Sequence, residues 1–156
     1  MLIKEYDNND INSMIEIWNE VVEDGLAFPQ MTLLTSESGL DFFAKQDFVG
    51  VAKEADKIVG LYILHPNNEG RCGHQANASY AVKRAMRGQK IGEQLVIHSL
   101  NKTKELGYSL MIFNAVVRDN KSALHLYQKL GFQQVGIIPK GFLLKNGKYQ
   151  DIIVHY

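Results

Sequence analysis

The chain has 156 residues, a length typical of a single domain with one hydrophobic core, and its 17 basic and 17 acidic residues leave no net charge. A neutral chain lacks the broad positive field that a nucleic-acid or anionic-membrane surface requires, so neither partner is expected. One cysteine, no long apolar run and a polar segment 1–10 indicate one domain, residues 1–156, in a reducing cytoplasm without disulfide, signal peptide or membrane span.

The N-terminal half alternates short strands with helices. Residues 2–6 predict a strand, and Asp10 can cap a helix whose apolar side chains recur at helical spacing until Gly25. The apolar connection 26–30 predicts a packed loop with one edge available to a binding site. The pattern then predicts a helix over residues 36–44 and a hairpin of two strands over residues 47–53 and 57–64.

The C-terminal half continues this alternation and completes a mixed α/β domain. Gly107 suits the left-handed conformation that follows a helix, and Asp119 or Asn120 can cap the next helix. Asn146-Gly147 is a strong hairpin signal, because both residue types tolerate positive φ. The expected elements are strands over residues 74–82, 110–117, 132–138 and 148–155, and helices over residues 91–106 and 121–130.

A turn rich in cations joins the predicted strand 74–82 to the helix that follows it. Its cations are Lys83, Arg84, Arg87 and Lys90, and its glycines are Gly88 and Gly92. A helix N-terminus offers unpaired N–H groups and the positive end of the helix dipole. We therefore interpret residues 83–92, called the cationic turn below, as a phosphate-binding site rather than as a solvated helix start.

Three motifs then occur in a fixed order. They are Arg87-Gly-Gln-Lys-Ile-Gly92, Phe113-Asn-Ala-Val-Val-Arg-Asp-Asn120 and Ala123-Leu-His-Leu-Tyr-Gln-Lys-Leu-Gly-Phe132. Across residues 73–138 their order and spacing resemble the acyl-CoA-binding half of the GNAT acetyltransferases. The resemblance implies an acyltransferase that uses acetyl-CoA as cosubstrate and no metal. It also implies a single mixed α/β domain: a mostly antiparallel, twisted sheet of about six to seven strands, with about four helices around it.

In that fold a splay between the fourth and fifth strands admits the pantetheine arm of the cofactor. The resemblance implies that backbone groups of Tyr80 and Val82 hold the pantetheine and the thioester carbonyl, and that residues 87–93 hold the pyrophosphate. The implied cofactor contacts are Tyr80, Val82, Arg87, Gly88, Gln89, Lys90, Ile91, Gly92, Glu93 and Asn120. Lys90 stands where the family pattern has its first glycine, and its ammonium could contact a phosphate if its φ is negative.

Tyr127 is the candidate proton donor. The family's corresponding tyrosine lies near the cofactor sulfur, so the resemblance implies that Tyr127 protonates the leaving thiolate. From the residues alone, Tyr127 could equally be a core aromatic residue with a satisfied hydroxyl. From its position, Asn120 could cap the following helix, whereas the resemblance implies that it contacts the cofactor. The two roles are compatible.

Asn77 and Asn114 are the candidates for binding the acceptor. Each is a polar residue in a run that otherwise looks buried, on strands expected to lie side by side, and a buried amide needs partners. Together with the segments 64–68 and 70–72, they resemble a fungal branch of N-acetyltransferases that act on proline analogues such as azetidine-2-carboxylate. In that branch the two matching asparagines are implicated in holding a small amino-acid substrate.

The general base is not evident from the sequence. No carboxylate lies between Arg71 and Val82, where many relatives carry a glutamate. His74 is the nearest titratable residue, and a backbone carbonyl with water, or an amine that arrives deprotonated, could replace it. Cys72 would suggest a covalent route, but no motif places a histidine or carboxylate to activate it.

Several functions therefore remain open beside transfer to a small-molecule amine. A protein N-terminal or lysine acetyltransferase would need an open acceptor groove near Phe28, Asn77 and Asn114. A CoA-binding sensor without turnover would account for the missing carboxylate, and a nucleotide-binding domain could use the same cationic turn. The C-terminal hairpin, residues 142–156, offers strands that could line a homodimer.

Overall fold

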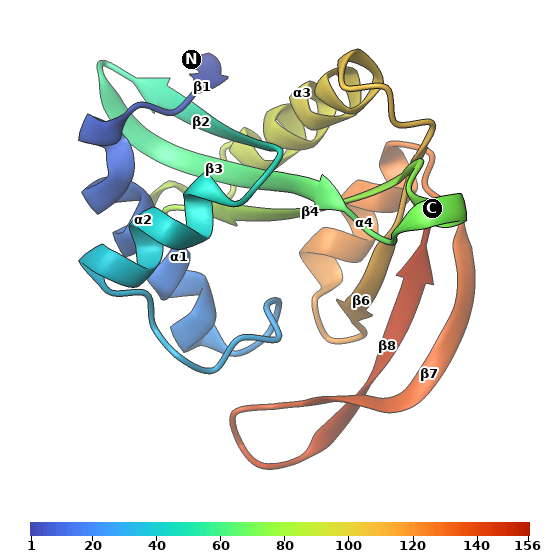
Figure 1. The fold of residues 1–156 in the computed structure, drawn as a ribbon. Helices are drawn as coiled ribbons and strands as arrows, with labels where there is room; N and C mark the ends of the chain where they lie inside the picture. Colours follow the sequence, from blue (N-terminus) through green and yellow to red (C-terminus); the bar gives the residue numbers. More distant parts are fainter.

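The computed structural model describes all residues 1–156 and contains four α-helices and eight β-strands (Figure 1). The helices are α1 (Ile11–Asp24), α2 (Ser36–Ala44), α3 (Ile91–Glu105) and α4 (Lys121–Lys129), and the short 3-10 helices are η1 (Asn8–Asp10), η2 (Gly70–Cys72) and η3 (Arg84–Met86). The strands are β1 (Leu2–Glu5), β2 (Phe48–Glu54), β3 (Lys57–Pro66), β4 (Gln75–Val82), β5 (Leu110–Met111), β6 (Phe113–Val117), β7 (Gln134–Leu143) and β8 (Tyr149–His155). No helix combines the length and the hydropathy that a membrane span requires.

The strands form two sheets, with the orders β1-β2-β3-β4-β5 and β6-β8-β7. Every pair is antiparallel except β4 and β5, which run parallel. The hairpin predicted from two successive apolar runs is β2–β3, and α2 has the predicted bounds. The mixed α/β, mostly antiparallel fold that the motifs implied is confirmed.

The strand predicted over residues 110–117 is divided between the two sheets, which corrects the prediction. β5 pairs with β4 over two residues, ending at Ala76↔Met111, whereas β6 pairs with β8. An apolar run indicates burial but does not identify the neighbouring strand, so the sequence did not predict the division into β5 and β6. Figure 1 shows β6 turning away from β4. This divergence is the splay expected between the predicted strands 74–82 and 110–117.

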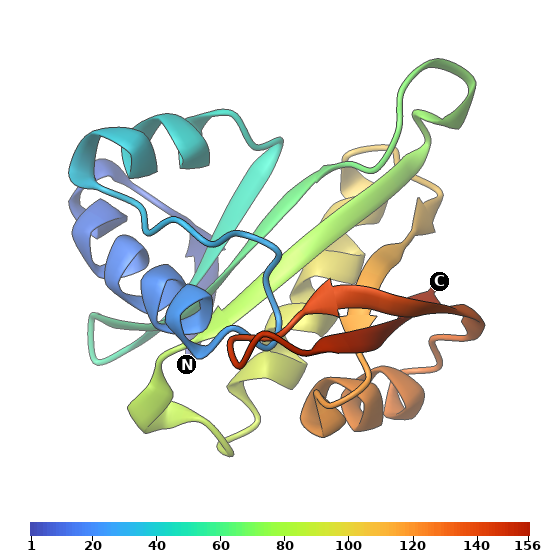
Figure 2. The ribbon, with the colours of Figure 1, turned by 90° about the horizontal axis from the view of Figure 1, so that it is seen from below.

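Helices cover both faces of the five-stranded sheet (Figure 2). On one face α1 and α2 pack around Trp18, whose ring stacks on Phe28 with centroids 4.2 Å apart. This buried position of Phe28 confirms a packed loop after α1. α3 packs on the other face, and β4 contributes to both cores, with Ala81 on the α1 side and Tyr80 on the α3 side. Successive side chains of β4 therefore face different halves of the molecule.

The start of α1 differs from the prediction. Asp10 precedes the helix, but its carboxylate does not cap it. Asp7 instead caps η1 by accepting from the Asn9 N–H at 2.9 Å. The Asp10 carboxylate accepts from the Asp7 N–H at 3.0 Å and from Lys53 Nζ at 2.6 Å. Asp10 therefore ties the start of α1 to β2, a role that depends on a residue far away in the chain.

The C-terminal hairpin also differs in detail. The strand predicted over residues 132–138 continues to Leu143, because β7 pairs with β8 on both sides of an irregularity after Ile138. In the turn only Gly147 has positive φ, at 82°. Asn146 contributes through its side chain, which accepts from the Lys148 N–H at 2.9 Å. The turn therefore lies at the predicted position, but Asn146 contributes a side-chain hydrogen bond and not a positive φ.

Asp10→Asn should lower the free energy of unfolding by about 1–3 kcal/mol, because the poorly exposed Lys53 ammonium loses its charged partner. Burial raises the Asp10 pKa, but hydrogen bonds from Lys53 and the Asp7 N–H outweigh this effect and hold the pKa below its ordinary 3.8. The wild-type advantage should therefore persist above pH 3.8 and disappear as the pH falls through the lowered pKa. Urea unfolding as a function of pH measures this.

Asp41→Asn is the matched control, because Asp41 pairs with Lys45 on the surface, where both side chains are more than half exposed. Its effect should stay within about 0.5 kcal/mol at every pH. Equal losses of unfolding free energy in the two variants would show that the Asp10–Lys53 pair stabilises the protein no more than an exposed pair does.

Candidate active site

The candidate site lies where β6 separates from β4. Beyond Ala76 this edge of β4 has no strand partner. The Ala76 carbonyl accepts a hydrogen bond on this edge, and alternate residues of a strand direct their backbone groups to the same edge. Tyr80 and Val82 lie an even number of residues from Ala76, so their backbone N–H groups face the gap. The gap therefore presents an unpaired strand edge inside the molecule.

Three amide side chains meet beside this gap, and we call Asn67, Asn77 and Asn114 the amide cluster. Asn67 Oδ1 accepts from Asn77 Nδ2 at 3.0 Å and from Asn114 Nδ2 at 2.7 Å. The sequence predicted that Asn77 and Asn114 lie close together, and it missed Asn67, because an asparagine after a strand is ordinarily a turn residue. The Oδ1 atoms of Asn77 and Asn114 make no hydrogen bond within the chain, so both can accept from a ligand.

The amide cluster and Tyr127 lie on opposite faces of the strands. Asn77 precedes Ala78, a member of the α3-side core, so the Asn77 side chain points to the α1 side. Asn114 follows Phe113, which also belongs to the α3-side core and whose ring centroid lies 4.5 Å from that of Tyr127. A ligand in the gap would have amides on one side and a tyrosine on the other.

Tyr127 projects from α4 into an aromatic cluster. Its ring packs against Phe113, Phe132 and His155. No buried side-chain nitrogen or oxygen lacks a hydrogen-bond partner, and the Tyr127 hydroxyl makes no hydrogen bond within the chain, so this hydroxyl keeps some contact with solvent. Burial of the side chain raises the pKa of Tyr127 above its usual value. Tyr127 is therefore protonated at neutral pH, and its hydroxyl can donate a hydrogen bond.

Asn120 is the N-cap of α4. Its Oδ1 accepts from the Ala123 N–H at 3.3 Å and from the Ser122 hydroxyl at 3.1 Å. Of the two predicted caps, Asn120 and not Asp119 takes this position. Since Nδ2 of Asn120 donates to no group of the chain, the residue can cap the helix and contact a ligand at the same time.

The cationic turn presents a continuous run of unpaired backbone N–H groups. No carbonyl of the chain accepts from residues 88–93, and the first bond entering α3 runs from the Gln94 N–H to the Lys90 carbonyl at 3.2 Å. The Glu93 carboxylate pairs with Lys129 at 2.7 Å and so joins α3 to α4, while the Glu93 N–H, in the first turn of α3, has no backbone acceptor. Such a run at a helix N-terminus suits a phosphate group.

Lys90 does not meet the condition of a negative φ, which corrects the prediction. Its φ is 62°, in the left-handed region that glycine enters most readily. Lys90 directly precedes α3, whose first residue, Ile91, is buried in the α3-side core. The chain must turn sharply into a helix that this packing holds in place, and the required turn outweighs the side-chain preference of Lys90.

Two cations of the turn are paired with the end of α1. The Asp24 carboxylate lies 2.8 Å from Arg84 Nη2 and 2.7 Å from Arg87 Nη1. Lys83 and Lys90 belong to no ion pair. The uncompensated positive charge of the turn therefore lies on these lysines, and no local pattern indicated the partner on α1.

The structure places no obvious base within the amide cluster. His74 is exposed and lies an even number of residues from Ala78, so its side chain is on the α3 side, opposite Asn77. Cys72 is exposed in η2, and no histidine or carboxylate hydrogen-bonds to it. No group of three or more histidine, cysteine, aspartate or glutamate side chains is arranged to hold a metal ion.

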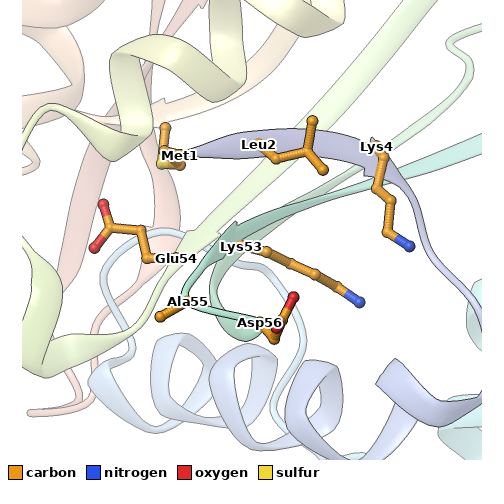
Figure 3. A pocket seen from close by; sticks show the side chains of 7 residues that line it. All are labelled: Met1, Leu2, Lys4, Lys53, Glu54, Ala55 and Asp56. Carbon is orange, nitrogen blue, oxygen red and sulfur yellow. The ribbon is translucent and has the colours of Figure 1, made fainter.

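A separate hollow of about 540 Å³ lies beside the β2–β3 turn (Figure 3). Its lining residues are Met1, Leu2, Lys4, Lys53, Glu54, Ala55 and Asp56. This turn is at the opposite end of β3 from Asn67, and none of the predicted site residues lines the hollow. The gap between β4 and β6, which the predicted site residues border, is therefore the candidate site.

Sequence comparison identifies relatives of the chain. The family model for the Acetyltransferase (GNAT) family matches residues 12–132. N-acetyltransferase aca1 of Schizosaccharomyces pombe is 29% identical over 99 residues, which are 63% of this chain and 47% of aca1. The chain thus spans about half the length of this relative.

Solved structures share the fold. A GCN5-related N-acetyltransferase from Kribbella flavida has a TM-score of 0.91 at 27% identity, covering 99% of this chain and 95% of that one. A phosphinothricin acetyltransferase from Sinorhizobium meliloti in complex with AcCoA has a TM-score of 0.90 at 21% identity, covering 99% and 85%, a likeness of fold alone. The family match contains β4, the cationic turn and α4. The chain belongs to the GNAT family of acetyltransferases.

Proposed function

We propose that the protein is an acetyl-CoA-dependent N-acetyltransferase that moves an acetyl group directly to the amine of a small molecule. One observation carries this proposal: the gap between β4 and β6 has free amide oxygens on one face and a free tyrosine hydroxyl on the other. Direct transfer requires the thioester and the amine to meet. Since these groups lie on both faces, the two substrates could approach the gap from opposite sides.

The donor side of the gap fits acetyl-CoA. Backbone groups of Tyr80 and Val82 would pair with the amides of the pantetheine arm, as an added strand would. The N–H groups of residues 88–93 would bind the pyrophosphate, and Asn120 Nδ2 would donate to the cofactor. A GNAT enzyme with the same fold holds acetyl-CoA in its crystal structure, which supports this assignment.

The chemistry needs one proton at sulfur and releases one from nitrogen. The amine forms a C–N bond with the acetyl carbon while the C–S bond breaks, and Tyr127 would protonate the departing thiolate. Asn77 and Asn114 would accept hydrogen bonds from the amine and hold it toward the thioester. With no side-chain base in the cluster, the proton from nitrogen would pass to water.

The acceptor that best fits the amide cluster is a small amino acid or a proline analogue such as azetidine-2-carboxylate. Two amide oxygens can bind the amine without a charged side chain beside it. The fungal branch that residues 64–80 resemble, and the match to a fission yeast N-acetyltransferase, favour this class. An amine screen with detection of free CoA thiol should show acetylation of such acceptors.

The same screen distinguishes the competing functions. Transfer to peptide N-termini or lysine side chains, with none to amino acids, would indicate a protein acetyltransferase. Tight binding of acetyl-CoA without acceleration by any amine would indicate a sensor. Competition by ATP as strong as that by CoA would indicate a nucleotide-binding domain.

Tyr127→Phe should lower kcat about 100-fold while changing the KM for acetyl-CoA less than about threefold, because it removes a proton donor and leaves the ring in place. Steady-state kinetics with thiol detection measures both constants. Tyr62→Phe is the matched control, since Tyr62 is also buried with a raised pKa but bonds to His98. Full activity of Tyr127→Phe would refute the role as acid.

Asn77→Ala and Asn114→Ala should each raise the KM for the acceptor about tenfold or more, with the KM for acetyl-CoA nearly unchanged. Each variant removes one oxygen proposed to bind the amine. Asn68→Ala is the control, because Asn68 neighbours the cluster but bonds to Gln75. A uniform loss of affinity for both substrates would instead indicate a damaged sheet.

A further inference from the structure

The last turn of α1 is acidic in a position where acidic side chains are unfavourable. Glu20, Glu23 and Asp24 lie at its end, and no basic residue is present there. The C-terminal end of a helix carries partial negative charge, so carboxylates at this end destabilise the helix unless they have cationic partners. Those partners come from the cationic turn.

The contacts between α1 and the turn form one connected set. Asp24 pairs with Arg84 at 2.8 Å and with Arg87 at 2.7 Å, each through a different carboxylate oxygen. Glu20 Oε2 accepts from the backbone N–H of Arg84 at 2.6 Å. Arg87 Nε also donates to the Val82 carbonyl at 3.2 Å, at the end of β4. The Arg87 guanidinium therefore connects α1, the turn and the strand edge.

The turn itself needs such an anchor. Gly88 and Lys90 both have positive φ, at 82° and 62°, and the lysine conformation is strained. Lys90 forms no side-chain cap for α3, and a Cβ at Gly88 would have no neighbour within 4 Å. Little inside residues 88–90 holds their backbone, so the conformation depends on the buried Ile91 that follows them and on the contacts made just before them.

We propose that Arg87 and Asp24 form a clasp that positions the cationic turn, so that the N–H groups of residues 88–93 converge on a diphosphate. In this role Arg87 is a positioning residue, and the phosphates bind the backbone rather than its guanidinium. The inference rests on the proposed use of acetyl-CoA and assigns a task to α1 that lies outside the reaction itself.

The clasp and the simpler alternative predict opposite effects at Asp24. If Arg87 bound phosphate directly, the Asp24 carboxylate would compete with the phosphates, and its removal would strengthen CoA binding. If Arg87 and Asp24 act as a clasp, removal of either partner lets the turn relax and weakens CoA binding. Ligands without a diphosphate should be insensitive to both changes.

The experiment compares Asp24→Asn, Arg87→Gln and the double variant by calorimetric titration with CoA and by NMR titration with pantetheine. Each single variant should weaken CoA binding about tenfold, and the double variant should be no weaker than the weaker single variant. Pantetheine affinity should change less than about twofold in all three. Asp41→Asn, which alters an exposed pair on α2, is the control and should bind CoA as the wild type does.

The clasp is refuted if Asp24→Asn binds CoA as tightly as the wild type or more tightly, or if the two single losses multiply in the double variant. Equal losses for CoA and pantetheine would also refute it, because they would indicate general damage to the fold. Failure of the wild-type protein to bind CoA would refute the proposed function and the clasp together. Normal wild-type binding with an unaffected Asp24→Asn refutes the clasp alone.

Discussion

The separation of β6 from β4 after Ala76 is the constraint on which the candidate site depends. A strand that continued beside β4 would take up the backbone groups of Tyr80 and Val82 and close the sheet. β6 pairs with β8 instead, so an unpaired edge remains between the two sheets. Unpaired strand edges are normally covered or blunted. An extended ligand is one such cover, and its amides would satisfy the exposed backbone groups.

Because β4 is pleated, the side chains that border the gap lie alternately on the two faces of the sheet. Asn77 faces α1, and Tyr80 faces α3, because successive side chains alternate. A register shift of one residue would exchange the two faces and remove the amide cluster. α1 contributes to both sides of this arrangement: Trp18 anchors one core, and Asp24 reaches the cationic turn. The same helix thus contacts the face of the sheet that carries Asn77 and the cationic turn.

Much of the fold follows from local patterns. The sequence pattern predicted α2 with its observed bounds, and Gly107, which follows α3, has the expected positive φ. The motif around Tyr127 and the cationic turn was sufficient to indicate the family, which comparison with known proteins confirmed. Asn77 and Asn114 also proved to be neighbours, since both donate to Asn67 Oδ1, although their strands β4 and β6 belong to different sheets.

What local patterns could not show depends on partners that are distant in the sequence. Asn67 joins Asn114 across 47 residues, and Asp24 joins Arg87 across 63. The sequence established the elements, the cations and the family motif, because capping, periodicity and turn preferences act within a few residues. The tertiary structure established the divided strand, the positive φ of Lys90 and the pairing of Arg87, because packing between distant segments outweighs local preference.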